Sequence, residues 1–110
     1  MEQQTTEALS LQVFERAAEL FGLLSTPVRV RIVSALCRGE KNVTELRRLI
    51  GVAQPNISQH LTMLHRSRIV SKRRQGAQVF YSIADEFLGL VCRAVCSQVA
   101  SETRDANLLG

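Results

Sequence analysis

Apolar residues recur at helical spacing along most of the chain and predict five helices. A first helix is expected at residues 11–24 behind a Ser10 cap, and a second at residues 27–37. A last helix, from about residue 85 to 101, is apolar on most of its sides. Helices this apolar need a partner, so the first and last helices predict a two-fold dimer.

Two shorter helices are predicted between residues 43 and 66, with a tight turn between them. Gly51 sits where the first of them should stop, and Pro55 fits the first turn of the second. Either Asn42 or Thr44 is suited to cap the first of these helices. Three or four residues between two short amphipathic helices are typical of a helix-turn-helix.

The segment from about residue 68 to 83 is predicted to be a two-stranded hairpin with its turn at Gly76. Lys72, Arg73 and Arg74 fall on or beside its tip, where cations can neutralise the backbone phosphates of a nucleic acid. A basic hairpin directly after a helix-turn-helix is a wing. The expected fold is therefore mainly α with a small β-hairpin wing, a winged helix-turn-helix in the order α-α-α-α-β-β-α.

The second helix of the helix-turn-helix has an apolar face and a polar face. Ile57, Leu61 and Leu64 share the apolar face, while amide and hydroxyl groups occupy the other. Such groups can bond base edges in the major groove, although an ordinary solvated helix face is the alternative. The candidate DNA-binding residues of this helix and the wing are Gln54, Asn56, Ser58, Gln59, Thr62, Lys72, Arg73, Arg74 and Gln78.

The composition is that of one small globular domain, with 110 residues of which 45% are hydrophobic and 22% charged. Residues 10–102 are expected to form it, between a flexible N-terminal segment at 1–9 and a flexible tail at 103–110. A net charge of +4 and a pI of about 9.5 favour a polyanionic partner. With no signal-peptide pattern and no apolar run near the roughly 20 residues that span a bilayer, a cytoplasmic protein without a membrane partner is expected.

Other polar residues have ordinary interpretations. No nucleophile–base pair, phosphate-binding loop or paired carboxylates in a plausible cleft are evident, so an enzyme is not expected. Arg29 and Arg31 are expected on a solvated face, with a phosphate contact as the alternative. His60 is expected to pack or to bond the backbone.

Three stretches carry a family pattern in the right order: LSTPVR at 24–29, QPNISQHLxxL at 54–64 and GxxVxY at 76–81. They resemble the ArsR/SmtB family of winged helix-turn-helix regulators. The resemblance extends over residues 20–83, more than half of the chain. It implies a homodimeric bacterial repressor that binds a double-stranded DNA operator and leaves it when an inducer binds.

The two metal-binding patterns of that family are absent from this sequence. At the start of the third helix, residues 45–49 contain no cysteine. On the last helix Asp85 and Glu102 are present, but Phe87 and Gln98 stand where imidazoles would be expected. Because zinc sites are built from Cys and His with few oxygen ligands, no zinc is expected at either place.

Three cysteines remain as candidates for sensing: Cys37, Cys92 and Cys96. Cys92 and Cys96 are one helical turn apart and face the same way. The thiols are candidates for a soft metalloid such as As(III), for oxidation or bridging by sulfur, or for a purely structural role as small buried hydrophobes. A sulfide-responsive branch of the family also has cysteines on its second and last helices. Here Cys37 comes about one turn later, and the last-helix cysteines about one turn earlier, than in that branch.

The sequence therefore predicts a sequence-specific DNA-binding repressor that releases its operator when an inducer reacts at the cysteine thiols. No cofactor other than such a metalloid is suggested. Two alternatives stay open. One is an ArsR-like regulator with structural cysteines and a different inducer. The other is a winged-helix protein-interaction module without DNA binding.

Overall fold

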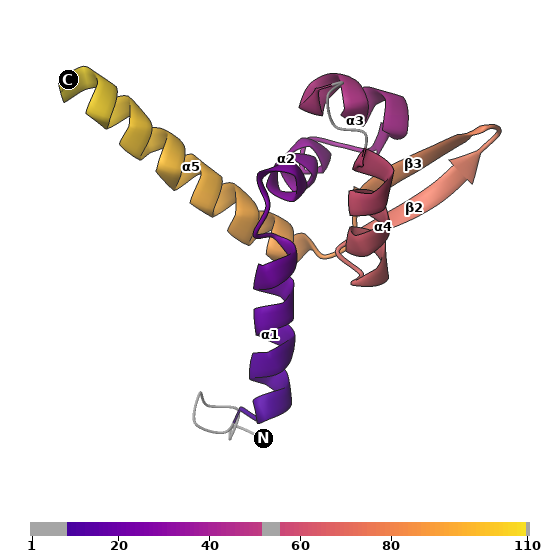
Figure 1. The fold of residues 1–110 in the computed structure, drawn as a ribbon, viewed down its shortest axis with the longest axis horizontal. Helices are drawn as coiled ribbons and strands as arrows, with labels where there is room; N and C mark the ends of the chain where they lie inside the picture. The colour runs from indigo at the N-terminus through magenta and orange to yellow at the C-terminus, as the bar shows by residue number, and fades with distance from the viewer. Residues whose placement is uncertain (1–8, 52–55, 110) are drawn as a thin grey trace.

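The computed structural model describes residues 9–51 and 56–109, with side chains through Asp105, and it forms a winged helix-turn-helix (Figure 1). The topology is the predicted one with an added short strand. The elements in chain order are α1 (Leu11–Leu23), α2 (Pro27–Leu36), β1 (Lys41–Asn42), α3 (Val43–Ile50), α4 (Ile57–Arg66), β2 (Val70–Gln75), β3 (Gln78–Ile83) and α5 (Glu86–Leu109).

The helix starts are set by polar caps, of which Ser10 was predicted and Asn42 was one of two predicted candidates. Ser10 and Thr26 accept bonds from backbone N–H groups three residues on, which caps α1 and α2. Asn42 and Glu45 form a reciprocal capping box at the start of α3. Gly51 ends α3 with φ of 119°, a backbone conformation that L side chains rarely adopt.

The sheet has three antiparallel strands in the order β1-β3-β2, so the prediction of a two-stranded hairpin was incomplete. β1 pairs with β3 through Lys41 opposite Tyr81 and Asn42 opposite Phe80. A strand of two residues has no alternation to detect, which is why the sequence pattern missed it. The β2–β3 turn lies at Gly76, whose φ is 64°, as a tight hairpin turn requires.

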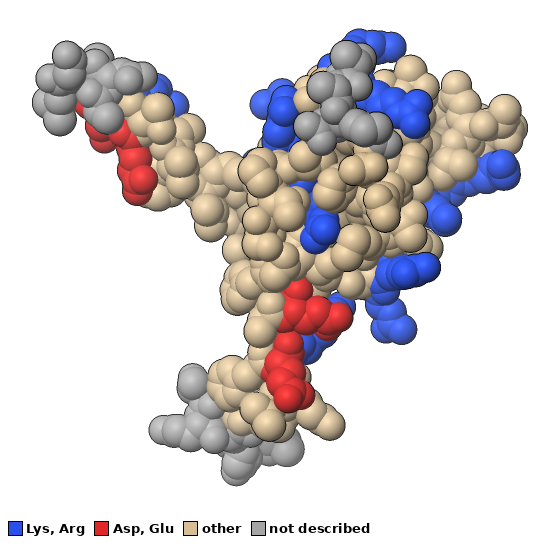
Figure 2. All heavy atoms as spheres, in the orientation of Figure 1, with Lys and Arg blue, Asp and Glu red and all other residues tan. Residues whose placement is uncertain are grey.

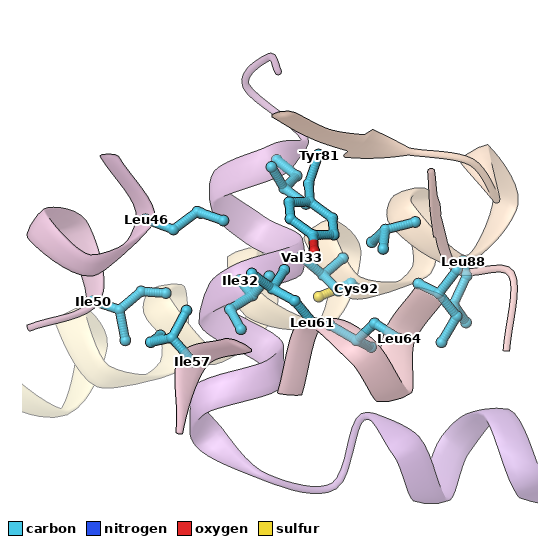
Figure 3. Close-up of a cluster of buried hydrophobic side chains, with 13 residues drawn as sticks. Ile32, Val33, Leu46, Ile50, Ile57, Leu61, Leu64, Tyr81, Leu88 and Cys92 are labelled. Carbon is cyan, nitrogen blue, oxygen red and sulfur yellow. The ribbon is translucent and has the colours of Figure 1, made fainter. Parts of the chain in front are cut away.

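The hydrophobic core lies where α2, α3 and α4 meet the base of the wing (Figure 3). Figure 3 shows Leu46 and Ile50 of α3 approaching α2 from one side, and Leu61 of α4 from below. The completely buried side chains are Ile32, Val33, Leu46, Ile57, Leu61, Leu64 and Ile69. Since every one of these elements contributes, the core fixes α4 and the wing to the same body.

α5 is longer than predicted. It continues to Leu109, although the sequence pattern led us to expect an end near Ser101 and a loose tail beyond it. The residues that follow Ser101 include Glu, Arg, Ala and Leu, which favour helix. No Gly or Pro occurs between Ser101 and Gly110. The apolar pattern alone therefore ended the helix too early.

The first and last helices leave much of their apolar surface uncovered by the rest of the chain. α1 has no buried residue, and Leu11 and Phe21 are 71% and 63% exposed. On α5, Leu88 and Cys92 are buried, whereas Phe87 is 80% exposed. The two helices project from the body in different directions (Figure 1). Among the described helices, none is both long and apolar enough to cross a membrane.

Candidate nucleic-acid interface

α4 is amphipathic in the sense that the sequence predicted. Ile57, Leu61 and Leu64 are completely buried. The other side of the helix is exposed to solvent and carries Asn56, Ser58, Gln59, Thr62 and Arg66. Gln54, the remaining candidate of this group, lies outside the described residues. The buried row leaves α4 one way to face, with its amide and hydroxyl groups outward.

Two of these polar side chains are in informative positions. Asn56 occupies the N-cap of α4, but its side chain makes no capping hydrogen bond. Its amide is therefore available to a partner outside the helix. The hydroxyl of Thr62 donates to the carbonyl of Ser58 at 2.9 Å, so it offers a partner its methyl group and lone pairs but not its proton.

The wing cations lie along β2, before the turn, and they divide between the two faces of the sheet. Lys72 pairs with Tyr81 across the strands, and Arg74 pairs with Val79, so both share the face of the buried Tyr81 side chain. Arg73 pairs with Phe80 and projects from the opposite face. All three cations are exposed, as is Gln78 at the turn.

Arg73 is held by other residues of the protein. Its guanidinium donates from Nε and Nη2 to the two carboxylate oxygens of Glu40, at 2.7 and 2.8 Å. It also lies 4.7 Å from the centre of the Phe80 ring. The neighbouring guanidinium holds the pKa of Glu40 below its usual value. Gln78 is also engaged, because its side-chain oxygen accepts from Asn42 at 3.4 Å.

Positive charge collects around this surface. Figure 2 shows lysine and arginine side chains around the helix-turn-helix and wing, while acidic side chains gather on α1 and the outer part of α5. In the sequence, no Asp or Glu occurs between Glu45 and Asp85. The cations in that interval are Arg47, Arg48, Arg66, Arg68, Lys72, Arg73 and Arg74. A surface of this kind attracts a polyanion.

α4 is also tied to its surroundings by arginines that the sequence pattern did not identify. Arg29 of α2 donates from Nε to His60 Nδ1 at 3.0 Å and from Nη1 to the Leu23 carbonyl at 3.0 Å. The expectation that Arg29 is simply solvated was therefore wrong, and His60 bonds a side chain instead of the backbone. Burial and the adjacent Arg29 lower the pKa of His60, so the imidazole is held neutral.

A second arginine connects α1 to the other end of α4. Arg16 Nη2 donates to the carbonyl of Ser67, the C-cap of α4, at 2.8 Å. A cation at a helix C-terminus also interacts favourably with the helix dipole. Both links join residues more than 30 positions apart, so no local pattern could have revealed them.

Comparison with known proteins places this architecture in a family. The family profile described as "Bacterial regulatory protein, arsR family" matches residues 26–72, from α2 into β2. A curated relative, the "Transcriptional repressor SmtB homolog" of Synechocystis, is 36% identical over 93 residues, which cover 84% of this chain and 70% of that protein. The chain belongs to the ArsR/SmtB family.

Solved structures share this fold. The transcriptional repressor BigR from Xylella fastidiosa is 36% identical with a TM-score of 0.68, covering 81% of this chain and 95% of that one. Mb0332 from Mycobacterium bovis, described as a homodimeric winged helix-turn-helix domain, has a TM-score of 0.72 at 24% identity. The match covers 96% of this chain and 95% of the Mb0332 chain. As a member of the ArsR family, the protein is a DNA-binding transcriptional repressor and not an enzyme.

The cysteines of this ArsR-family chain lie where α2 meets α5. The Cys37 thiol is 3.7 Å from the Gly89 carbonyl, and the Cys92 thiol is 4.0 Å from the Val30 carbonyl. Cys37 and Cys96 both line a cleft of about 290 Å³, together with Ser34, Arg38 and Arg93. The sequence-predicted sensing residues are therefore brought to one contact between two helices.

Burial makes two of these thiols weaker acids than an exposed cysteine thiol. It raises the pKa of Cys37 above its usual value, and burial together with the adjacent Cys96 raises the pKa of Cys92 to about 11. Within residues 9–51 and 56–109, no group of three or more Cys, His, Asp or Glu side chains is placed to hold a metal ion. At the positions of the family's metal-binding pattern on the last helix, Asp85 accepts a hydrogen bond from the Leu88 N–H, and Gln98 donates one to Glu102.

The Arg29–His60 bond predicts a pH dependence. Because the folded protein holds His60 neutral, the unfolded chain binds the proton more readily, and the free energy of unfolding should decrease as pH falls through 6.5. Urea unfolding between pH 8 and pH 5.5 measures this loss. His60→Asn should reduce it, whereas His65→Asn, which removes the other histidine, should leave it in place. An equal loss in the wild type and in His60→Asn would contradict this assignment.

Proposed function

We propose that this repressor binds its operator as a two-fold dimer, with α4 in the major groove and the wing along the phosphate backbone. We further propose that chemistry at the α2–α5 cysteines releases it. The observation that supports the first part best is the orientation of α4. Its apolar row is completely buried, so its amide and hydroxyl groups face outward, and residues 46–84 around it contain no Asp or Glu.

The base contacts are assigned to the exposed side of α4. Asn56 and Gln59 carry amides that can bond adenine bidentately, and Ser58 can bond a base or a phosphate. Thr62, whose proton is used within the helix, offers its methyl group to thymine. Gln54 completes the set as a candidate from the sequence. Asn56, Ser58 and Gln59 lie at the N-terminal end of α4, the end that recognition helices present to base edges.

The wing supplies backbone contacts. Lys72 and Arg74 are exposed cations without a carboxylate partner in the described part of the chain, so they can neutralise phosphates. Gln78 lies at the turn and can donate its amide N–H groups to a phosphate while its oxygen accepts from Asn42. Arg73, bound by Glu40, contributes its charge from a fixed position.

The dimer is inferred from the apolar surfaces of α1 and α5. Exposed large side chains on both helices would form a patch that monomeric proteins rarely leave open. The related Mb0332 structure is described as homodimeric. A two-fold axis through α1 and α5 would give each operator two reading helices, set about one helical turn of DNA apart.

The proposed switch acts at the contact between the dimer helix and the body. Cys37, at the C-cap of α2, and Cys96 of α5 line one cleft, so a bond between them would lock the two helices in one arrangement. A polysulfide or other two-electron oxidant would take two electrons and two protons from the thiols as the S–S bond forms. Arsenite would instead react as arsenous acid, forming one As–S bond to each thiol while one hydroxide per bond leaves arsenic and departs as water with the thiol proton. Either change would alter the spacing of the two α4 helices.

Single substitutions should separate base contacts from phosphate contacts. Gln59→Ala should weaken operator binding by about 1–3 kcal/mol and leave binding to a scrambled duplex unchanged, because only a base contact is lost. Arg74→Gln should weaken both, and should reduce the slope of log K against log salt by about 0.9. Fluorescence anisotropy over a salt series measures both quantities.

A matched control for charge is Arg104→Gln, which removes a cation from the distant part of α5. It should change the salt slope by much less than Arg74→Gln does. If Gln59→Ala weakens scrambled and operator duplexes equally, α4 does not read bases through Gln59.

The thiol switch predicts a loss of DNA affinity on treatment with polysulfide or arsenite. Reduced protein bound to a labelled promoter duplex should lose about 5–150-fold in affinity, the usual range of allosteric coupling. Cys37→Ser and Cys96→Ser should each abolish the response to polysulfide, and Cys92→Ser should retain it. If wild-type binding is indifferent to both reagents, the cysteines serve in packing and another inducer acts.

A further inference from the structure

Arg73 spans the outer face of the whole three-stranded sheet. The strand order is β1-β3-β2, with Asn42, Phe80 and Arg73 in register across it. From β2, the Arg73 side chain passes 4.7 Å from the Phe80 ring of β3. It ends on the carboxylate of Glu40, the residue just before β1. The two strands at the edges of the sheet are thereby joined by a single side chain.

This connection reaches the helix-turn-helix. β1 consists of Lys41 and Asn42, and Asn42 is also the N-cap of α3. Glu40 is therefore two residues before the N-cap of α3, the first helix of the helix-turn-helix. Beyond these two β1 residues, the wing is a two-stranded ribbon, and such a ribbon has little stability of its own. A contact that fixes β2 to the residue preceding β1 constrains the angle of the wing relative to α4.

The guanidinium of Arg73 is already engaged by partners within the protein. Besides the two bonds to Glu40, its Nη1 donates to the Gln75 side-chain oxygen at 2.7 Å. To turn toward a phosphate, Arg73 would have to give up a bidentate charge-assisted pair and its contact with the Phe80 ring. Lys72 and Arg74 project from the other face of the sheet and carry no such cost.

We propose that Arg73 is a positioning residue for DNA binding. Together with Glu40 it sets the angle of the wing, and Lys72 and Arg74 make the phosphate contacts. This inference rests on the proposed operator binding by α4 and the wing. An exposed ion pair contributes little to global stability, and here the Arg73 and Glu40 side chains are 51% and 34% exposed. Loss of this ion pair should therefore change operator affinity and leave the free energy of unfolding nearly unchanged.

Glu40→Gln tests this inference because the two explanations predict opposite changes in operator affinity. The substitution raises the formal net charge of +4 by one and frees Arg73. If Arg73 were a phosphate contact, operator binding would become tighter. If Glu40 and Arg73 position the wing, operator affinity should fall about threefold to tenfold, the span of 0.7 to 1.4 kcal/mol by the ordinary affinity conversion. Binding to a scrambled duplex should hold or increase, so the ratio of the two affinities falls.

A substitution at the other partner gives an independent readout. Arg73→Lys keeps the charge but cannot form the bidentate pair, so it should lose operator affinity as Glu40→Gln does, with an unchanged salt slope. The double variant Glu40→Gln/Arg73→Lys should be no worse than either single variant. Thermal unfolding of each variant, matched to wild type, verifies that the fold is intact.

Two results would overturn the positioning role. One is operator binding by Glu40→Gln that equals or exceeds that of the wild type. The other is wild-type operator affinity in Arg73→Lys together with a salt slope reduced by about 0.9 in Arg73→Gln, as expected for a lost phosphate contact. Failure of the wild-type protein to prefer operator over scrambled duplex would instead contradict the proposed function itself.

Discussion

The buried row of α4 is the constraint on which the rest of the interface depends. Ile57, Leu61 and Leu64 are completely buried against the core, and together they fix the rotation of the helix about its axis. Because side chains on a helix repeat every 3.6 residues, burying this row commits Ser58, Gln59 and Thr62 to solvent. The DNA contacts that the proposed function assigns to α4 therefore depend on the burial of this apolar row.

The core alone does not hold the orientation of α4. Arg29 bonds His60 in its second turn, and Arg16 of α1 bonds the carbonyl at its C-terminal end. The wing is tied in the same way, through Arg73 and Glu40, to the residue preceding β1. Positively charged residues thus serve two purposes in this protein. In the proposed function, Lys72 and Arg74 meet the DNA backbone, whereas arginines with partners inside the protein position the elements that bind DNA.

The sequence predicted the features that depend on local helix caps and on the spacing of apolar residues. The starts of α1 and α3 follow from the caps at Ser10 and Asn42, and the faces of α4 follow from apolar spacing. It could not predict β1, which is too short for a pattern. Nor could it distinguish Arg73 from Lys72 and Arg74, because a run of three cations does not reveal which one meets a carboxylate 33 residues earlier. Long-range bonds of this kind depend on the folded topology.

Pairing of two chains would cover the apolar surfaces of α1 and α5, which one chain alone leaves exposed. The most direct test is the mass of the complex on a promoter duplex. Two 12.3 kDa chains should bind together at one operator, and binding should collapse when about five base pairs are inserted between the half-sites, rotating one by half a turn. Stable binding of a single chain, or binding indifferent to that insertion, would contradict operator binding by a two-fold dimer.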